Sequence, residues 1–397
     1  MVRCGGVRRA LLVGFLVLAS AYVHAFTQAP TGRSAATPRT GSSPGAGERV
    51  LMVEEVFKTV ELLRGIPVDT FFEVMGTFAS SMGNDCTFCH ASNAALDKSA
   101  FATPTPRLRR ARQMIQMMNA LNQQYFNGQQ RVTCFTCHGG SNRPRADPSF
   151  MVQYGEPVLD PDARDFLTDP RVNVNEVFDR YLQAIGGADR LARLTSYTAR
   201  GTYSGFDTDK STVPIEVYAK APAQQTVVVH LTIGASTRVF DGRNAWIAGP
   251  EQPLPLLTLT GGNLDRARLE GLANFPTGLR QAYSRWRGGR TVLDDKDVTV
   301  LQATSDGDPV VQLYFDNNGL LVRLLRFTVT PVAFVPTRLD YADYRELPGV
   351  GVKVPFRRTL TQTYMQMTLQ LTDIQPNAPI DAARFARPAP VKLQSEK

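Results

Sequence analysis

The chain has 397 residues, of which 43% are apolar, and a formal net charge of +8 at pH 7. This length accommodates two globular domains, and the composition excludes a disordered chain. Removal of three arginines in the leader, Arg3, Arg8 and Arg9, would lower the charge from +8 to +5. A charge this modest on an exported chain predicts no nucleic acid partner.

Residues 1–25 have a basic start, an apolar run from Ala10 and a small-residue end at Val23-His24-Ala25. This order is typical of a secretory signal peptide cleaved after Ala25, and it predicts a periplasmic protein. The alternative is an uncleaved N-terminal membrane anchor, but the apolar run is shorter than the roughly 20 residues that span a bilayer. Residues 26–49 are rich in Pro, Gly, Ser and Thr and are predicted to form a flexible linker.

Only Cys4 lies in the leader, and the four remaining cysteines occur in two copies of the pattern Cys-x-x-Cys-His. The copies are Cys86, Cys89 and His90, and Cys134, Cys137 and His138. In this attachment signature of c-type haem, two thiols bond the haem edge and the histidine is the proximal iron ligand. Two disulfides or a zinc site are the alternatives, but neither needs a histidine directly after the second cysteine. We therefore expect two covalently bound haem c groups.

Two helices are predicted before the two motifs. The first begins near Pro67 and ends at Gly83, and one face carries Phe71, Met75, Phe78 and Met82. The second begins at Thr105-Pro106 and ends near Asn127-Gly128, with Met114, Met118, Leu121 and Tyr125 on one face. Methionines in such a stripe more often pack in a protein core than ligate a metal.

Each iron needs a sixth ligand or an open position, and the chain has few candidates. His24 leaves with the leader, and His230 alternates with apolar residues on the outer face of a predicted strand. Methionine is the remaining candidate. Met75 is far enough from Cys86 in the sequence for the chain to double back and offer its sulfur from the opposite side of the haem. Arg107, Arg109, Arg110 and Arg112 cluster on the second helix, where a solvated face, a docking surface and pairing of Arg112 with a haem propionate are all open.

The stretches "FFEVMGTFASSMGNDCTFCH" and "ARQMIQMMNALNQQYFNGQQRVTCFTCHGGSNRP" resemble the repeating haem unit of the cytochrome c subunit of photosynthetic reaction centres. The resemblance covers about residues 50–150, which we take as a dihaem cytochrome c domain. It implies Met75 as the axial ligand of the haem at Cys86 and Met114, or alternatively Met118, for the haem at Cys134. The family carries four haems, whereas this chain has two attachment motifs.

Residues 151–172 are Pro- and Asp-rich and are predicted to be a linker. After it, a helix interrupted at Gly186-Gly187 precedes a series of strands, so the expected fold class is α + β with two domains. The expected strands cover residues 215–221, 226–233, 298–304, 310–316, 320–330, 337–347 and 357–375, and residues 263–275 and 278–289 are expected to be helices or lids. Residues 391–397 would be a tail.

Segments such as "FDGRNAW", "LYFDNNGLL" and "PIDAARF" resemble the outer-membrane lipoprotein-carrier and sorting proteins (LolA-like) over residues 173–390. The resemblance implies an antiparallel β half-barrel around an apolar cavity, plugged by helices and suited to a lipid, a quinone or another hydrophobic ligand. The alternative is a packed scaffold that positions the haem domain.

These features predict a periplasmic dihaem cytochrome that relays single electrons between periplasmic or membrane-bound redox partners. His/Met ligation fills the sixth position of both irons, which favours electron transfer over catalysis at iron, and no catalytic residues are expected. Two alternatives remain: a dihaem oxidoreductase or peroxidase with one labile Met ligand, and a lipid- or quinone-binding carrier with redox-linked haems.

Overall fold

The computed structural model describes residues 49–95, 98–144, 147–148, 153–155, 160–305 and 308–392. The predicted leader, the predicted linker up to residue 48 and the tail from residue 393 lie outside the described residues. No helix within the described ranges is both long enough and apolar enough to cross a membrane.

The first described part of the chain is helical. It contains α1 (Val53–Val56), α2 (Val68–Met82), α3 (Pro106–Tyr125) and α4 (Cys134–His138), together with the 3-10 turns η1 (Cys86–Phe88), η2 (Ser92–Ala95) and η3 (Lys98–Ala102). The sequence places the ends of the two long helices correctly. Helix α2 stops at Gly83, whose φ of 61° is left-handed, and α3 starts after Thr105, whose hydroxyl accepts from the Leu108 N–H at 3.1 Å.

A second pair of helices, α6 (Val174–Ala184) and α7 (Ala188–Arg193), precedes the sheet. The predicted interruption lies where expected, because Gly186 and Gly187 both have positive φ, at 135° and 87°.

The C-terminal part is one antiparallel sheet of 13 strands. Its order is β6-β5-β4-β3-β2-β1-β13-β12-β11-β10-β9-β8-β7, so β1 and β13 pair at the centre and β6 and β7 lie at the edges. The strands are β1 (Ser196–Gly205), β2 (Val213–Lys220), β3 (Gln224–Leu231), β4 (Gly234–Phe240), β5 (Ala245–Ala248), β6 (Leu257–Thr258), β7 (Trp286–Leu293), β8 (Lys296–Ser305), β9 (Asp308–Phe315), β10 (Leu321–Val329), β11 (Phe334–Glu346), β12 (Lys353–Thr361) and β13 (Gln366–Pro376). The predicted antiparallel sheet is confirmed.

Two details of the strand prediction were wrong. The run 357–375 is not one strand, because the chain turns between Thr361 and Gln366 and pairs β12 with β13 as a hairpin. The stretch 278–289, expected to be a helix or lid, is not one helix: it holds the last residue of the 3-10 turn η5 (Pro276–Gly278), the whole 3-10 turn η6 (Arg280–Ala282) and the start of β7. A short 3-10 turn η4 (Phe206–Thr208) follows β1.

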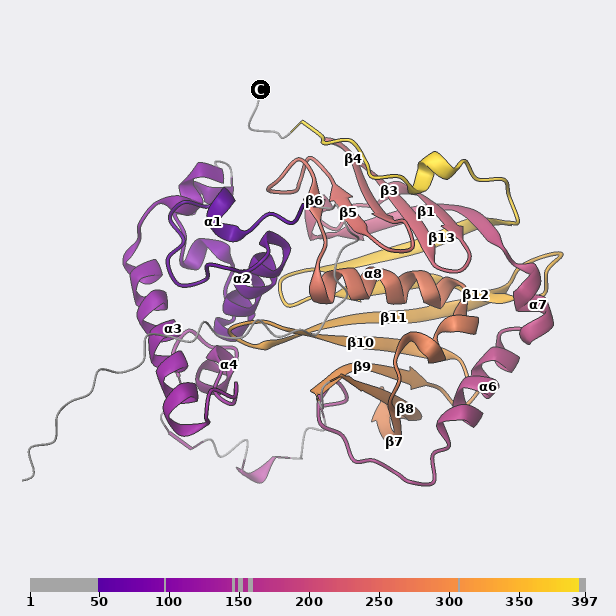
Figure 1. Ribbon diagram of the computed structural model, residues 1–397, viewed down its shortest axis with the longest axis horizontal. Coiled ribbons are helices and arrows are strands. Elements are labelled where there is room, and N and C mark those ends of the chain that lie inside the picture. The colour runs from indigo at the N-terminus through magenta and orange to yellow at the C-terminus, as the bar shows by residue number, and fades with distance from the viewer. Residues whose placement is uncertain are drawn as a thin grey trace, which may run out of the picture. The chain divides into compact units, whose positions relative to one another are not determined.

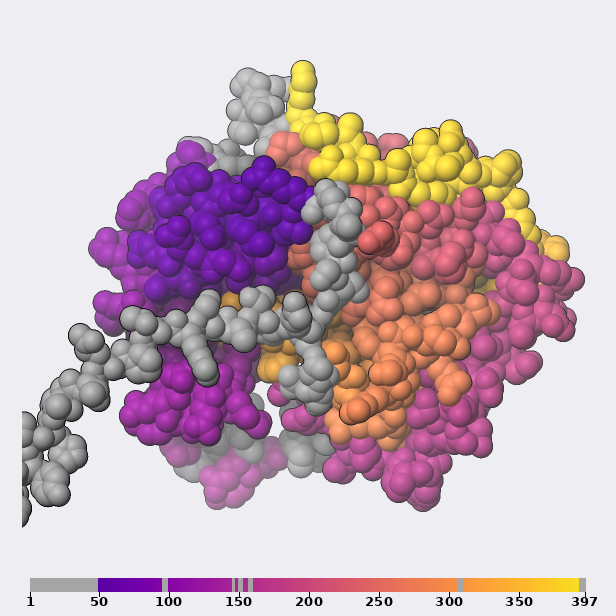
Figure 2. Space-filling view, in the orientation of Figure 1, coloured from indigo at the N-terminus to yellow at the C-terminus, as the bar shows by residue number. Residues whose placement is uncertain are grey.

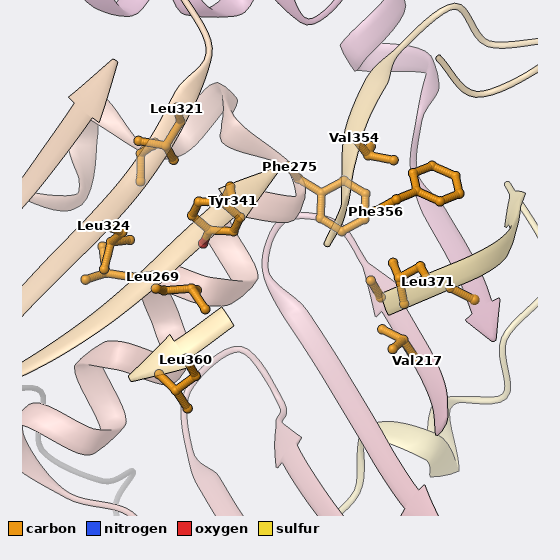
Figure 3. Packing of buried hydrophobic residues seen from close by; sticks show 14 of the residues in the cluster. Val217, Leu269, Phe275, Leu321, Leu324, Tyr341, Val354, Phe356, Leu360 and Leu371 are labelled. Atoms are coloured by element: carbon orange, nitrogen blue, oxygen red, sulfur yellow. The ribbon is translucent and has the colours of Figure 1, made fainter. Parts of the chain in front are cut away.

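Helix α8 (Gly261–Asn274) lies against one face of the sheet (Figure 1). The main apolar core forms on this face, where Leu269 of α8 lies among strand residues such as Leu324 and Leu360 (Figure 3). Phe178 and Tyr181 of α6 belong to the same cluster. The alternation predicted for half-buried strands accounts for this core, since Leu324, Leu339 and Leu371 all point to the same side.

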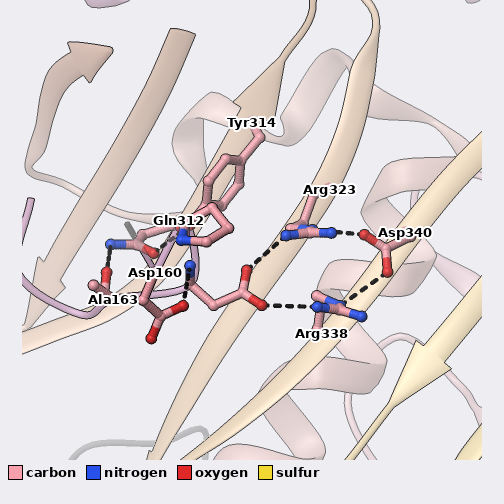
Figure 4. Close-up of polar contacts among 9 residues, drawn as sticks. Asp160, Ala163, Gln312, Tyr314, Arg323, Arg338 and Asp340 are labelled. Carbon is pink, nitrogen blue, oxygen red and sulfur yellow. Dashed lines mark hydrogen bonds and ion pairs between the residues drawn. The ribbon is translucent and has the colours of Figure 1, made fainter. Parts of the chain in front are cut away.

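The opposite face of β8–β11 is contacted by the connection 160–168. The Asp162 carboxylate forms ion pairs with Arg323 and Arg338, both at 2.8 Å (Figure 4). Asp340 pairs with the same two arginines, with Arg323 at 2.6 Å and with Arg338 at 2.9 Å. The Gln312 side chain adds a hydrogen bond to the Ala163 carbonyl at 3.0 Å. The predicted linker is therefore ordered here by a four-membered ion-pair network.

The end of the chain returns over β3. After the 3-10 turn η7 (Ala382–Phe385), it runs along one edge of the molecule in yellow (Figure 2). The Thr226 hydroxyl donates to the Arg384 carbonyl at 2.6 Å and the Val391 N–H to the Pro255 carbonyl at 3.1 Å.

Candidate haem-attachment sites

The first Cys-x-x-Cys-His motif forms a single helical turn. Cys86 begins η1, and the Asp85 carboxylate accepts from the Thr87 N–H at 2.8 Å as its N-cap. The His90 N–H donates to the Cys86 carbonyl at 3.1 Å, which closes the turn. Cys86 and Cys89 are thus three residues apart on a helical turn, the spacing that two bonds to one haem edge require.

The second motif is the five-residue helix α4. Thr133 caps it with a reciprocal pair of hydrogen bonds, from the Thr136 N–H to the Thr133 hydroxyl at 3.3 Å and from the Thr133 N–H to the Thr136 hydroxyl at 3.0 Å. Gly139 ends it with a φ of 54°. The first motif thus begins as a 3-10 turn and the second is an α-helical turn, and each has its own cap.

Both motif histidines have the same hydrogen-bonding arrangement. The Nδ1 of His90 lies 2.9 Å from the Phe101 carbonyl, and the Nδ1 of His138 lies 3.0 Å from the Ser141 carbonyl. A carbonyl accepts only, so we assign the proton to Nδ1 in each ring, which leaves the Nε2 lone pair for a metal. A fixed Nδ1–H is the usual support for a histidine that ligates a metal through Nε2.

The four motif cysteines are free thiols. Burial raises the pKa of Cys134 to about 11, and burial also raises the pKa values of Cys86 and Cys89. A dithiol redox motif needs a lowered thiol pKa, so this environment does not suit one. Across the part of the chain that the structure describes, no three His, Cys, Asp or Glu side chains gather as a metal site.

The methionines predicted as axial ligands lie on α2 and α3. Met75 and Met118 pack in one apolar cluster, which also includes Cys134 of the second motif. Met118 is 3% exposed, and Met114 is half-buried. The assignment of each methionine to one iron stays a prediction.

Helix α3 also holds both motifs in place, which sequence reasoning missed. The Thr105 hydroxyl donates to the Cys89 carbonyl at 2.5 Å, and the Arg107 guanidinium donates to the Phe88 carbonyl and lies 4.2 Å from the centre of the Phe88 ring. At the other end, the buried Asn122 amide receives the Val132 N–H at 2.8 Å and donates to the Val132 carbonyl at 2.7 Å. No pattern in the sequence marks Asn122.

The arginine cluster has divided roles. Arg109 and Arg110 are exposed, whereas Arg112 donates to the Glu61 carboxylate at 2.6 Å and to the Thr59 carbonyl at 2.9 Å. Pairing of Arg112 with a propionate stays a prediction. His230 is an exposed strand residue, as predicted, and lies 3.2 Å from Glu216.

Helix α2 is tied to the sheet region by buried polar contacts. The Asp69 carboxylate accepts hydrogen bonds from the Thr260 N–H and hydroxyl, both at 2.7 Å, and thereby fixes the N-cap residue of α8. The Gln362 amide, in the β12–β13 turn, donates to Glu73 at 3.0 Å. Gly76 leaves room for Tyr364 of the same turn, since an added Cβ would lie 2.3 Å from that ring.

A cavity of about 70 Å³ lies between α8 and the sheet. Its walls are mainly apolar and come from β2, β3, β12 and β13, including Val217, Val229, Leu360 and Leu371. Arg238, Arg266, Glu270, Tyr341 and Arg358 also line it. About 10–15 Å³ on this scale holds one water, so this cavity is small for a whole lipid.

Comparison with known proteins gives separate results for the two parts of the chain. Residues 27–152 match the family described as photosynthetic reaction centre cytochrome C subunit. The resemblance predicted for residues 50–150 is confirmed, and this part of the chain is cytochrome-like.

Among solved structures, the chain is similar to a LolA superfamily protein from Nitrosomonas europaea (13% identity, TM-score 0.35, covering 54% of this chain and 98% of that one). It is also similar to a DUF1329 family protein from Desulfovibrio piger (12% identity, TM-score 0.37, covering 55% of this chain and 98% of that one). A third match is a putative outer membrane lipoprotein-sorting protein domain from Vibrio parahaemolyticus (12% identity, TM-score 0.33, covering 54% of this chain and 97% of that one). The predicted LolA-like resemblance is thus found, at low identity.

Proposed function

We propose that the protein is a periplasmic dihaem c-type cytochrome that relays single electrons between periplasmic or membrane-bound partners. The observation that carries this proposal is the repeated arrangement of two helical Cys-x-x-Cys-His turns, each with an imidazole fixed through Nδ1. The similarity of residues 27–152 to a cytochrome family supports it.

The donor set fits haem c at both motifs. Cys86 and Cys89, and Cys134 and Cys137, would form the thioether bonds, and His90 and His138 would ligate iron through Nε2. When bound, haem would supply one-electron Fe(III)/Fe(II) chemistry. The carbonyls of Phe101 and Ser141 hold each ring in one tautomer and orientation, and the apolar cluster around Met75 and Met118 excludes water beside the second motif.

A count of haems tests the proposal directly. The chain exported from cells with a haem-attachment system should carry two haems per polypeptide by mass and by pyridine haemochrome absorbance. The double variant Cys134→Ala/Cys137→Ala should carry one. A wild-type protein without covalent haem would overturn the proposal.

The axial ligands can be tested separately. Met75→Ala and Met114→Ala should each open one reduced haem to carbon monoxide, seen as a shift of the Soret band, and Met118→Ala tests the alternative to Met114. Met117→Ala is the matched control, because Met117 lies on the same helix but is 46% exposed. Carbon monoxide binding by the wild-type protein would instead favour the oxidoreductase or peroxidase alternative.

We infer a second candidate function for the sheet region, the binding of a hydrophobic ligand. The apolar cavity beneath α8 supports it. An organic extract of the purified protein should contain a lipid or a quinone, and an extract free of both would favour a scaffold role.

A further inference from the structure

The cavity beneath α8 contains more charge than an apolar binding site needs. Three guanidinium groups line it, those of Arg238, Arg266 and Arg358, against one carboxylate, that of Glu270. The nearest pairing is between Arg266 and Glu270, whose atoms are 3.4 Å apart. The lining residues therefore carry two positive charges in excess.

The arginines present buried hydrogen-bond donors that the protein does not use. The Nε atoms of all three are buried and, among the described residues, have no hydrogen-bond partner. Among the described residues, Arg238 donates through another nitrogen to the Met367 sulfur at 3.2 Å, and Arg358 donates to the Tyr197 hydroxyl at 3.0 Å. Neither partner is an anion, and the carboxylate that acts on Arg358 is again Glu270, which opposes the effect of burial, raises the pKa of Arg358 and is shared with Arg266.

The Tyr341 hydroxyl adds a fourth donor. It is buried and has no hydrogen-bond partner among the described residues. Burial raises the pKa of Tyr341 well above its ordinary value, while the nearby Arg358 opposes that shift. The hydroxyl keeps its proton at neutral pH and can donate to an acceptor in the cavity.

Buried charges and buried donors without partners are both unfavourable, and proteins retain few of them. An anion in the cavity would satisfy both needs, since an Nε–H together with a neighbouring nitrogen forms the edge that binds a carboxylate or a phosphate in two places. The rest of the wall is apolar, with Val227, Val229 and Leu371 among its residues. An ion without an apolar part would leave that apolar surface without a contact.

We propose that the cavity binds an amphiphilic anion, with a carboxylate or phosphate head at Arg238, Arg358 and Tyr341 and an apolar tail along the sheet. This inference rests on the second candidate function above and names its ligand class. The cavity volume of about 70 Å³ fits a head group.

Titration calorimetry on the exported full-length protein tests the ligand class. The probes are dodecanoate, dodecyl phosphate and the neutral dodecanol, with acetate as a head without a tail. Dodecanoate or dodecyl phosphate should bind at one site at least tenfold more tightly than dodecanol and acetate. Equal binding of dodecanol would overturn the anionic head but keep a hydrophobic ligand, and equal binding of acetate would overturn the tail. No binding of any probe would overturn both.

Variants assign the site. Arg238→Gln should weaken dodecanoate at least tenfold and leave dodecanol unchanged, and Tyr341→Phe, which changes only the hydroxyl, should weaken dodecanoate two- to fivefold. Arg357→Gln is the matched control, because Arg357 is exposed and alternates with Arg358 on β12. Unchanged dodecanoate binding in both Arg238→Gln and Tyr341→Phe would place the head elsewhere and overturn the assignment. Haem content, measured on the same samples, reports on the dihaem proposal separately.

Discussion

The helical region and the sheet are stabilised in different ways. The largest apolar cluster of the sheet is built from the strands, α6, α7 and α8, and takes no residue from α1–α4. The cluster around Met75 and Met118 instead borrows Val332, Ala333 and Val335 from the sheet region. Only Ile115, Met118 and Asn122 are buried in the 20 residues of α3. An amphipathic helix without a large buried face is marginal on its own, so α3 needs a further apolar partner, which the proposed haems would provide.

Loss of haem should therefore affect the two regions unequally. With Cys86, Cys89, Cys134 and Cys137 all changed to Ala, we expect α3 to lose most of its helicity while the sheet stays folded. Far-ultraviolet circular dichroism and limited proteolysis report on the two regions. The wild-type chain made without haem attachment is the control and should behave alike. Full helicity in either sample would contradict the comparison.

Asp265 of α8 should cause the largest loss of stability by a single substitution in the sheet region. Its carboxylate receives Arg326 at 3.1 Å and Arg268 at 2.6 Å, and Arg326 is buried. Asp265→Asn leaves the buried Arg326 without its anion, which costs about 3–5 kcal/mol. Urea unfolding measures this loss of unfolding free energy, and Asp297→Asn, at an exposed position, is the control. A loss equal to that of the control would refute the role of this pair.

The same carboxylate predicts a dependence on pH. Burial alone would raise the pKa of Asp265, but Arg326 and Arg268 outweigh it and lower that pKa below the ordinary value of 3.8. The folded state therefore binds this proton less tightly than the unfolded state, so the contribution to stability is present above pH 3.8 and is lost as the pH falls through the lowered value. Asp265→Asn should remove this acid-dependent part of the unfolding free energy, and an unchanged pH profile would contradict it.

Asp69 joins the two regions, and its loss should have a smaller effect. Asp69→Ala removes the buried acceptor of the Thr260 N–H and hydroxyl, and an unsatisfied buried donor costs about 1–3 kcal/mol. Hydrogen exchange should show faster opening of the start of α8 and of α2 together. Asp179→Ala, at an exposed position on α6, is the control and should leave both unchanged.

Thr105 should give the smallest effect. Thr105→Ala removes the N-cap of α3 and the contact with the Cys89 carbonyl, and a lost cap costs about 1 kcal/mol. Hydrogen exchange of the amides in the first turn of α3 measures the loss of this cap, and Thr103→Ala, at an exposed position, is the control. Equal protection in both variants would show that the cap contributes nothing.

Local signals explain which parts could be predicted from the sequence. Thr105-Pro106 and Gly83 act within one helical turn, so the ends of α2 and α3 follow from the residues themselves. The strands β8–β11 are rich in branched and aromatic residues, and the sequence predicted all four. Strand β1 was missed because its Ser, Thr and Gly content hides the buried Tyr197 and Tyr203.

Long-range contacts explain what could not be predicted. The turn between β12 and β13 has no Gly or Pro, so the alternation of residues 357–375 continues across it without a signal. The hydrogen bonds between Asp69 and Thr260 join residues 191 positions apart, and nothing local to Asp69 indicates its partner. The carbonyls that orient His90 and His138 carry no side-chain signature at all.

The close approach of Gly83 to Gly140 has a consequence for electron tunnelling. A Cβ on Gly83 would lie 2.2 Å from the Gly140 carbonyl oxygen, and the Gly140 N–H donates to the Ser81 carbonyl at 2.9 Å. Main-chain atoms thus lock the end of α2 onto the turn that follows the second motif. If both motifs carry haem as proposed, this main-chain lock would fix the spacing of the two motifs, on which the transfer rate depends, while side-chain changes on the helices would alter the redox potentials.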